Sequence, residues 1–219
     1  MSKDNLLDAL IEQTKLSKKQ TDKQQKIIET AIQMFAEKGY ANTSTNEIAK
    51  AAGVAEGTIF RHYGTKDNLL LSVILPFLKE ALPSIAENVF KEVLTEETLH
   101  FEDFLKGLFK NRIEFVIENR EIFQIIVKEL LYSDSLRQEI APFFADSVAK
   151  RITQAIELFK DRGEIKDLPT HLLKDMLLTT FGGFLVTNFV LLPSQEKMDI
   201  DQEVDKLVNF VIDGIRNRN

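Results

Sequence analysis

Apolar residues recur at helical spacing along nearly the whole chain, and no long stretch alternates with the period of two that is typical of a strand. The pattern therefore predicts an all-α fold. Pro76 is expected to kink or split one helix, and Pro83 to separate it from the next, because proline lacks the N–H that a helix interior uses. A short amphipathic helix is expected at residues 5–12, and the helices predicted after residue 65 are 66–80, 84–94, 101–119, 121–132, 135–162, 171–192 and 201–217.

Three further helices are predicted between these, and each has a clear start or stop signal. The first begins with a capping box at residues 21–24 and ends at Gly39, and the second begins with a capping box at residues 44–47 and ends at Gly53. The third is short, from Glu56 to Tyr63. The residues expected to be buried in the first two are Ile27, Ile28, Ala31, Ile32, Phe35, Ile48, Ala49 and Ala52.

Two short helices joined by a tight glycine-containing turn, at residues 44–63, are typical of a helix-turn-helix. Short helices and turns also occur in other all-α proteins, so the residue types carry the interpretation. Ile59 and Tyr63 are four residues apart and can face the core, which leaves the opposite face of the third helix for DNA. The small or hydrogen-bonding residues expected on that outer face are Gly57, Thr58, Arg61 and His62.

Lys66 follows Thr65, a predicted N-cap, and so lies in the first turn of the next helix. A cation is disfavoured there by the helix dipole. A bound DNA phosphate would suit both the lysine and the free N–H groups of that turn. The alternative is an exposed lysine that costs only a few tenths of a kcal/mol.

The charge of the chain is unevenly distributed. The formal net charge is −6, but residues 17–66 carry eight basic and five acidic side chains. A mildly basic head on an acidic body is compatible with DNA binding. The excess is small, however, and many solvated surfaces show one like it.

The run TSTNEIAKAAGVAEGTIFRHYGTKDNLL at residues 43–70, with IIETAIQMFAEKGY before it, resembles the signature of tetracycline-repressor-type (TetR family) regulators. The similarity covers roughly residues 24–72. It implies an N-terminal three-helix DNA-binding domain and a C-terminal helical domain that binds an effector and dimerises. On this basis residues 1–20 form an N-terminal extension, residues 21–66 the helix-turn-helix domain, and residues 67–219 the effector-binding and dimerisation domain.

The resemblance also implies DNA contacts by position. Two departures from the family pattern matter. Phe60 stands where tyrosine is frequent, so no hydroxyl can reach a phosphate, and Glu56 stands where a neutral or basic residue is more usual. Glu56 either accepts a hydrogen bond from a cytosine N4 or points away from the DNA. The expected DNA contacts are Thr45, Asn46, Glu56, Gly57, Thr58, Phe60, Arg61, His62 and Lys66.

Residues 176–192 contain no charge, so a membrane span competes with a core helix. The stretch is near the short limit for a span, and threonine, asparagine and a glycine pair interrupt it. A helix buried on all sides is favoured, and no membrane association is expected.

The last predicted helix carries apolar residues in steps of four, three and four, the spacing of a helix–helix seam: Val204, Val208, Val211 and Ile215, with Leu207 and Ile212 beside them. The seam could equally pack within its own subunit. The resemblance implies a homodimer through the last two long helices, and Gly182 and Gly183 would permit close approach there. Two heads related by a two-fold axis would read a palindrome.

The sixteen phenylalanines, with no tryptophan, indicate an apolar interior. They could form an ordinary packed core or line a pocket for a hydrophobic effector, and the pocket rests on the resemblance. The residues expected to line it are Phe115, Phe123, Thr180, Phe181, Phe184 and Asn188.

Other functional classes are disfavoured. The chain has no cysteine, which excludes disulfides and thiolate metal sites, and its N-terminus does not read as a signal peptide. A cytoplasmic protein without cofactor or metal is expected. An enzyme is not expected, since His62, His100 and His171 are far apart and no catalytic motif is present, although folding could bring two carboxylates together. The favoured function is a repressor released from operator DNA by a small effector; the alternative is a ligand-binding or interaction module that has lost DNA binding.

Overall fold

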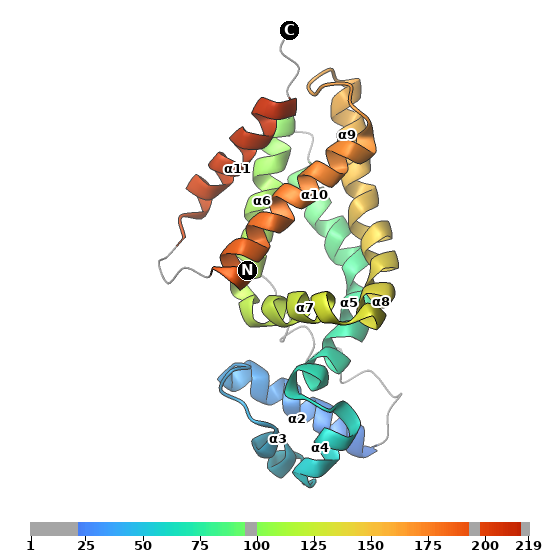
Figure 1. The fold of residues 1–219 in the computed structure, drawn as a ribbon, viewed down its shortest axis with the longest axis vertical. Helices are drawn as coiled ribbons and strands as arrows, with labels where there is room; N and C mark the ends of the chain where they lie inside the picture. The colour runs from blue at the N-terminus through green and yellow to red at the C-terminus, as the bar shows by residue number, and fades with distance from the viewer. Residues whose placement is uncertain (1–21, 95–99, 193–197, 216–219) are drawn as a thin grey trace. The chain divides into compact units, whose positions relative to one another are not determined.

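The computed structural model describes residues 22–94, 100–192 and 198–215, and within these residues the chain forms helices and turns but no β-strand (Figure 1). The all-α prediction is confirmed. The predicted helix at residues 5–12 and the capping residue Thr21 lie outside the described residues. The contacts divide the chain into two compact units, Met1–Ala81 and Leu82–Asn219. The functional boundary that we predict after residue 66 stays a prediction.

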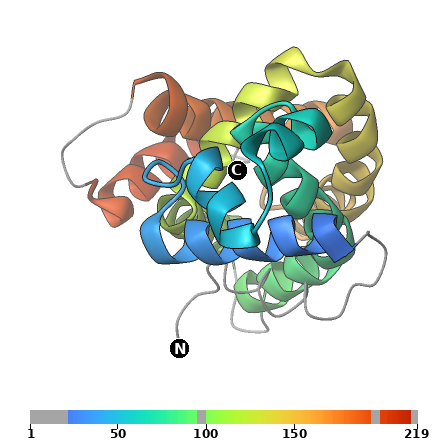
Figure 2. The same ribbon diagram turned by 90° about the horizontal axis from the view of Figure 1, so that it is seen from below.

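The first unit contains α2 (Asp22–Lys38), α3 (Thr45–Ala52), α4 (Glu56–Tyr63) and the first part of α5 (Lys66–Val93). In Figure 2, α2 is seen along its length in blue, with α3 and α4 beside it. The apolar faces predicted for α2 and α3 are buried as expected, and Leu69, Leu70 and Ile74 of α5 complete this core.

Local signals explain where α3 begins and ends. The hydroxyl of Ser44 accepts a hydrogen bond from the Glu47 N–H at 3.2 Å, and the Glu47 carboxylate accepts one from the Ser44 N–H at 3.0 Å. Gly53 ends the helix with a left-handed φ of 69°, which a residue with a Cβ adopts only with strain. Thr65 caps α5 by accepting from the Asn68 N–H at 3.0 Å. These predicted start and stop signals are confirmed.

The predicted split at Pro76 and the predicted separation at Pro83 are wrong, because α5 is one helix from Lys66 to Val93; the alternative of a kink at Pro76 stays a prediction. Pro83 is exposed, and a proline within a helix lowers its stability because one backbone hydrogen bond is lost and the ring clashes with a carbonyl of the preceding turn. Packed apolar residues on both flanks, among them Leu71, Ile74, Ala86 and Val89, outweigh that loss.

The second unit is built around α6 (Phe101–Glu118), which contacts α7 (Arg120–Tyr132), α10 (Thr170–Val186) and α11 (Ile200–Ile215). The predicted helix at 135–162 consists of α8 (Asp134–Phe144), a π-helical turn at Ala145–Ala149 and α9 (Lys150–Asp161). Likewise α10 continues into a second π-helical turn, Thr187–Leu191. The core includes Phe101, Phe104 and Phe159, whose ring centroids lie 5.2 to 6.0 Å apart.

The apolar stripe of α11 packs inside its own subunit. Val204, Val208 and Val211 are buried in the core that α6 dominates, and in Figure 1 α11, in red, lies beside α6. Ion pairs flank the contact, from Lys106 to Asp205 at 2.9 Å and from Lys110 to Asp201 at 2.5 Å. The seam was expected either to form a dimer interface or to pack within its own subunit, and the structure supports packing within the subunit. The side chain of Ile215 lies outside the described residues.

α10 is not buried on all sides, which corrects the prediction for residues 176–192. Leu173 and Leu177 face the core, but the opposite side is exposed. From Met176 onward the helix carries no charge, yet in a single chain only part of its surface is covered. No helix in the described part of the chain combines the length and apolar character needed to cross a membrane. The exposed side presents Leu172, Met176, Thr179 and Gly183, in steps of four, three and four.

Candidate nucleic-acid interface

α4 has one face toward the core and one toward solvent, as a recognition helix requires. Ile59 is buried and anchors the helix, while Tyr63 is half-buried, and its burial raises the pKa of the phenol. Gly57, Phe60, Arg61 and His62 are exposed, and Thr58 is partly exposed.

Gly57 leaves open space on the outer face of α4. A Cβ placed at this position would meet no atom within 4 Å, and the backbone does not require a positive φ. The fold of this unit therefore does not explain a glycine here. The missing side chain leaves room for an external group to approach the helix backbone.

Glu56 has partners on the neighbouring helix. Its carboxylate accepts a hydrogen bond from Thr45 Oγ1 at 2.7 Å and another from Asn46 Nδ2 at 3.1 Å. These bonds, that from Thr45 first, hold the pKa of the Glu56 carboxyl below its ordinary value. Glu56 thus joins the first turn of α4 to the first turn of α3. The sequence predicted that Glu56 either accepts from a cytosine N4 or points away from the DNA, and this contact with α3 was not predicted.

Lys66 is held inside the unit rather than left free. Its Nζ donates to the carbonyl oxygens of Tyr40 and Thr43, each at 2.9 Å, and lies 4.1 Å from the centroid of the Tyr40 ring. The Tyr40 hydroxyl in turn donates to the carboxylate of Asp67. These contacts clamp the start of α5 to the turn between α2 and α3. These contacts stabilise a cation in the first turn of α5 without a phosphate. The phosphate contact of Lys66 stays a prediction.

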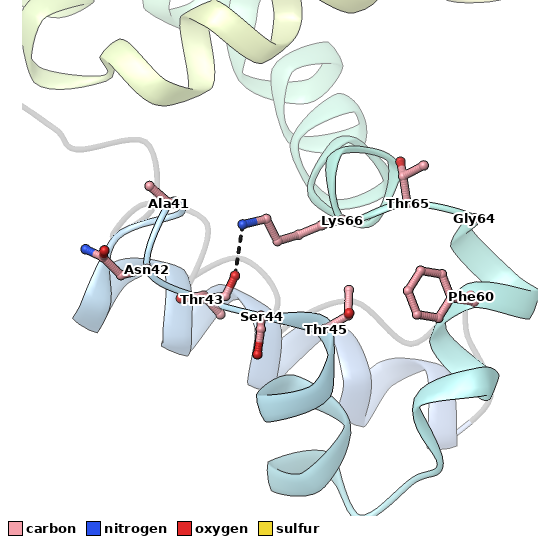
Figure 3. A pocket seen from close by; sticks show the side chains of 9 residues that line it. All are labelled: Ala41, Asn42, Thr43, Ser44, Thr45, Phe60, Gly64, Thr65 and Lys66. Atoms are coloured by element: carbon pink, nitrogen blue, oxygen red, sulfur yellow. Dashed lines mark hydrogen bonds between the residues drawn. The ribbon is translucent and has the colours of Figure 1, made fainter.

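A cavity of about 500 Å³ lies between the turn before α3 and the start of α5 (Figure 3). Thr45 and Lys66, the first residues of α3 and α5, both line it, so two helix N-termini meet at one concave surface. Phe60, 49% exposed, forms part of its wall. Helix N-termini carry unsatisfied N–H groups and partial positive charge, which suits an anion such as a phosphate.

The predicted DNA contacts thus fall into three sets, two of which share Thr45. The cavity is lined by Thr45, Phe60 and Lys66. Hydrogen bonds join Glu56 to Thr45 and Asn46, and the other predicted contacts lie along α4. Sequence reasoning missed Tyr40 and Thr43. Thr43 is buried, and its hydroxyl donates to Gly39 O at 2.9 Å. Residues of the cavity not predicted from the sequence are Ala41, Asn42, Thr43, Ser44, Gly64 and Thr65.

The six predicted effector residues are all partly buried, and four of them, the phenylalanines, pack against the core of the second unit. Phe181 stacks on Phe109 with centroids 4.2 Å apart, and Asn188 Nδ2 donates to Phe184 O at 2.9 Å. The predicted residues are Phe115, Phe123, Thr180, Phe181, Phe184 and Asn188.

A charged residue that the sequence did not single out lies beside them. The guanidinium of Arg112 lies over the Phe115 ring, 4.7 Å from its centroid, and donates to Asn111 Oδ1 from Nε at 2.9 Å. Burial lowers the pKa of Arg112. A partly buried cation beside an aromatic ring is suited to bind an anionic group. The described residues contain no cluster of three histidine, aspartate or glutamate side chains that could hold a metal ion.

Comparison with known proteins gives one consistent result. Residues 27–73 match the family described as bacterial regulatory proteins, tetR family. The fatty acid metabolism regulator protein of Bacillus subtilis (strain 168) is 25% identical over 206 residues, which cover 92% of this chain and 100% of that protein.

Solved structures agree with this in fold. The fatty acid degradation regulator FadR from Bacillus halodurans has a TM-score of 0.59 at 25% identity, over 92% of this chain and 100% of that one. FadR from Bacillus subtilis, in complex with stearoyl-CoA, has a TM-score of 0.56 at 22% identity, over 86% of this chain and 97% of that one.

Proposed function

The chain belongs to the TetR family of bacterial transcriptional regulators, and we propose on this basis that it binds a palindromic operator as a homodimer and is released by a fatty acyl effector. It acts as a repressor in the cytoplasm. The observation that carries the DNA-binding part is the cavity where the N-termini of α3 and α5 meet beside the exposed face of α4.

The cavity binds the DNA backbone, whereas α4 contacts the bases. The two helix N-termini hold a backbone phosphate, which sets the position of the protein on the duplex without reading sequence. α4 then enters the major groove, where Gly57 allows close approach and Arg61 reaches the base edges.

Arg61→Ala is expected to weaken binding to the preferred operator by about tenfold or more and to relax the preference at particular base pairs, because a good side-chain–base pair is worth about 1–3 kcal/mol. Fluorescence anisotropy with operator duplexes, each altered at one base pair, measures both effects. The wild-type affinity should fall steeply with salt, as phosphate contacts require.

The matched control is Lys91→Ala, which removes the same charge from an exposed position on α5 and should leave the base preference unchanged. An Arg61→Ala protein with wild-type base preference would remove Arg61 from the reading surface. If the wild-type chain shows no salt-dependent binding to its own promoter DNA, the alternative of a module without DNA binding is the correct one.

The dimer is assigned to the exposed side of α10. This side has the spacing of a helix seam, and a Cβ placed on Gly183 would meet no atom within 4 Å. The glycine is therefore not needed for packing within the subunit, but it permits close approach of a second helix. On α11 a large apolar side chain that faces outward is Phe210, 72% exposed, whereas the valine stripe is buried.

The effector is assigned to the aromatic region of the second unit. The partly buried phenylalanines offer an apolar lining, and Arg112 supplies a cation beside Phe115. A long acyl chain with an anionic headgroup matches both features. The similarity to a fatty acid metabolism regulator, and to a FadR structure that contains stearoyl-CoA, supports the same class.

Stearoyl-CoA is expected to release the operator, whereas coenzyme A alone is not, because the acyl chain supplies the apolar contact. Thermodynamic linkage requires that operator DNA weaken stearoyl-CoA binding by the same factor. Titration calorimetry on free and DNA-saturated protein measures this factor. Equal affinity in the two states would contradict the mechanism.

Phe184→Ala should reduce the release of operator DNA by stearoyl-CoA, while Tyr132→Ala, at an 82% exposed position on α7, should not.

A further inference from the structure

Both carboxylate oxygens of Glu56 accept a hydrogen bond from α3. Oε1 accepts from Thr45 Oγ1 at 2.7 Å, and Oε2 accepts from Asn46 Nδ2 at 3.1 Å. Thr45 and Asn46 are the first two residues of α3, and Glu56 is the first residue of α4. The contact therefore joins the two helices at the ends assigned to DNA.

Glu56 can only accept hydrogen bonds in this arrangement. The bonds from Thr45 and Asn46 lower the pKa of its carboxyl, so the group is ionised near neutral pH. An ionised carboxylate has acceptors and no donor. It must therefore face the amide nitrogen of Asn46 and not the amide oxygen.

The bond to Glu56 decides which amide atom of Asn46 faces outward. An asparagine amide has nearly the same shape when its oxygen and nitrogen are exchanged, so its neighbours decide which atom faces outward. With Nδ2 held by Glu56, Oδ1 remains for an external partner, together with the second N–H of Nδ2. Asn46 is exposed and can meet such a partner.

We propose that Glu56 is a positioning residue for sequence recognition: by fixing the amide of Asn46, it selects a base with an exocyclic amino group, adenine or cytosine, at the position that Asn46 faces. Oδ1 accepts from adenine N6 or cytosine N4. Guanine O6 and thymine O4 are acceptors: the second N–H of Nδ2 can donate to them, but Oδ1 would then lack a donor, so they are disfavoured where Oδ1 faces the base. The inference rests on the proposed DNA-binding function.

The test is selection of bound sequences from a pool of randomised duplexes, followed by competition with duplexes that differ at one base pair. For the wild-type protein, one position should favour adenine or cytosine, and Asn46→Ala should abolish that preference. Glu56→Gln should reduce the preference at the same position from about tenfold towards unity, because a glutamine amide can accept from Asn46 or donate to it, and the Asn46 amide is then free to flip. Preferences elsewhere should remain.

The matched control is Glu37→Gln, which removes the same charge from an exposed position on α2 and should keep the wild-type preference. Circular dichroism establishes that each variant is folded, and Glu56→Ala provides a second replacement if glutamine destabilises α4. The proposal is overturned if Glu56→Gln and Glu56→Ala keep the preference, or if Asn46→Ala removes none. A wild-type protein that selects no sequence would instead overturn the DNA-binding function itself.

Discussion

Met176→Glu is expected to convert the dimer into a monomer and to weaken operator binding by about a hundredfold or more. Met176 is 57% exposed in the middle of the apolar side of α10. In a two-fold interface each substitution places one buried charge from each subunit close together, and neither charge has a partner. A monomer loses the gain of about 10²–10⁴ that two linked heads have over one. Sedimentation velocity and operator titration measure the two effects.

Two further variants test where the interface lies. Phe210→Glu on α11 should also favour the monomer, whereas Tyr132→Glu should leave the dimer intact, although Tyr132 is also aromatic and is more exposed than Phe210. A dimeric Met176→Glu protein with wild-type operator affinity would show that the exposed side of α10 is not the interface. The helix would then need another explanation for its exposed apolar residues.

Lys66→Met is expected to destabilise the N-terminal unit by about 2 kcal/mol, because hydrogen bonds from a charged group contribute about 1.5–3 kcal/mol and the carbonyls of Tyr40 and Thr43 would lose their donor. Amide hydrogen exchange should increase in the turn before α3. Denaturant unfolding with a probe in this unit gives the free-energy difference.

The same variant separates the internal clamp from the predicted phosphate contact. Loss of a phosphate contact lowers the slope of log K against log salt by about 0.9, whereas loss of the clamp lowers stability without requiring that change. Lys23→Met, an exposed lysine on α2, is the control for both measurements. Unchanged stability and unchanged hydrogen exchange in Lys66→Met would show that the clamp contributes nothing.

Signals that act over a few residues were predicted well from the sequence. Each helix cap depends on groups within one helical turn, so the local amino-acid sequence is sufficient to specify it. Examples are the capping box of Ser44 and Glu47, the stop at Gly53 and the cap at Thr65. The prolines show the limit of such rules. The same local reasoning predicted breaks at Pro76 and Pro83, but packing along α5 kept the helix continuous.

The candidate site was predicted only as a set of residues. The contacts of Glu56 are made 10 and 11 residues back along the chain, and those of Lys66 are made 23 and 26 residues back. No periodic pattern encodes such pairs. Both side chains were therefore assigned from the sequence to solvent or DNA, whereas the structure places them in hydrogen bonds within the unit.

The all-α class, the three-helix head and the apolar faces of its helices follow from the order of the residues, because helical periodicity and capping are local properties of the chain. What covers each face depends on how the folded chain packs. The valine stripe of α11 packs on α6, while α10 leaves the side with Leu172 and Met176 exposed. Periodicity identifies an apolar face, but the identity of its partner depends on how distant segments pack, and that information lies in the fold.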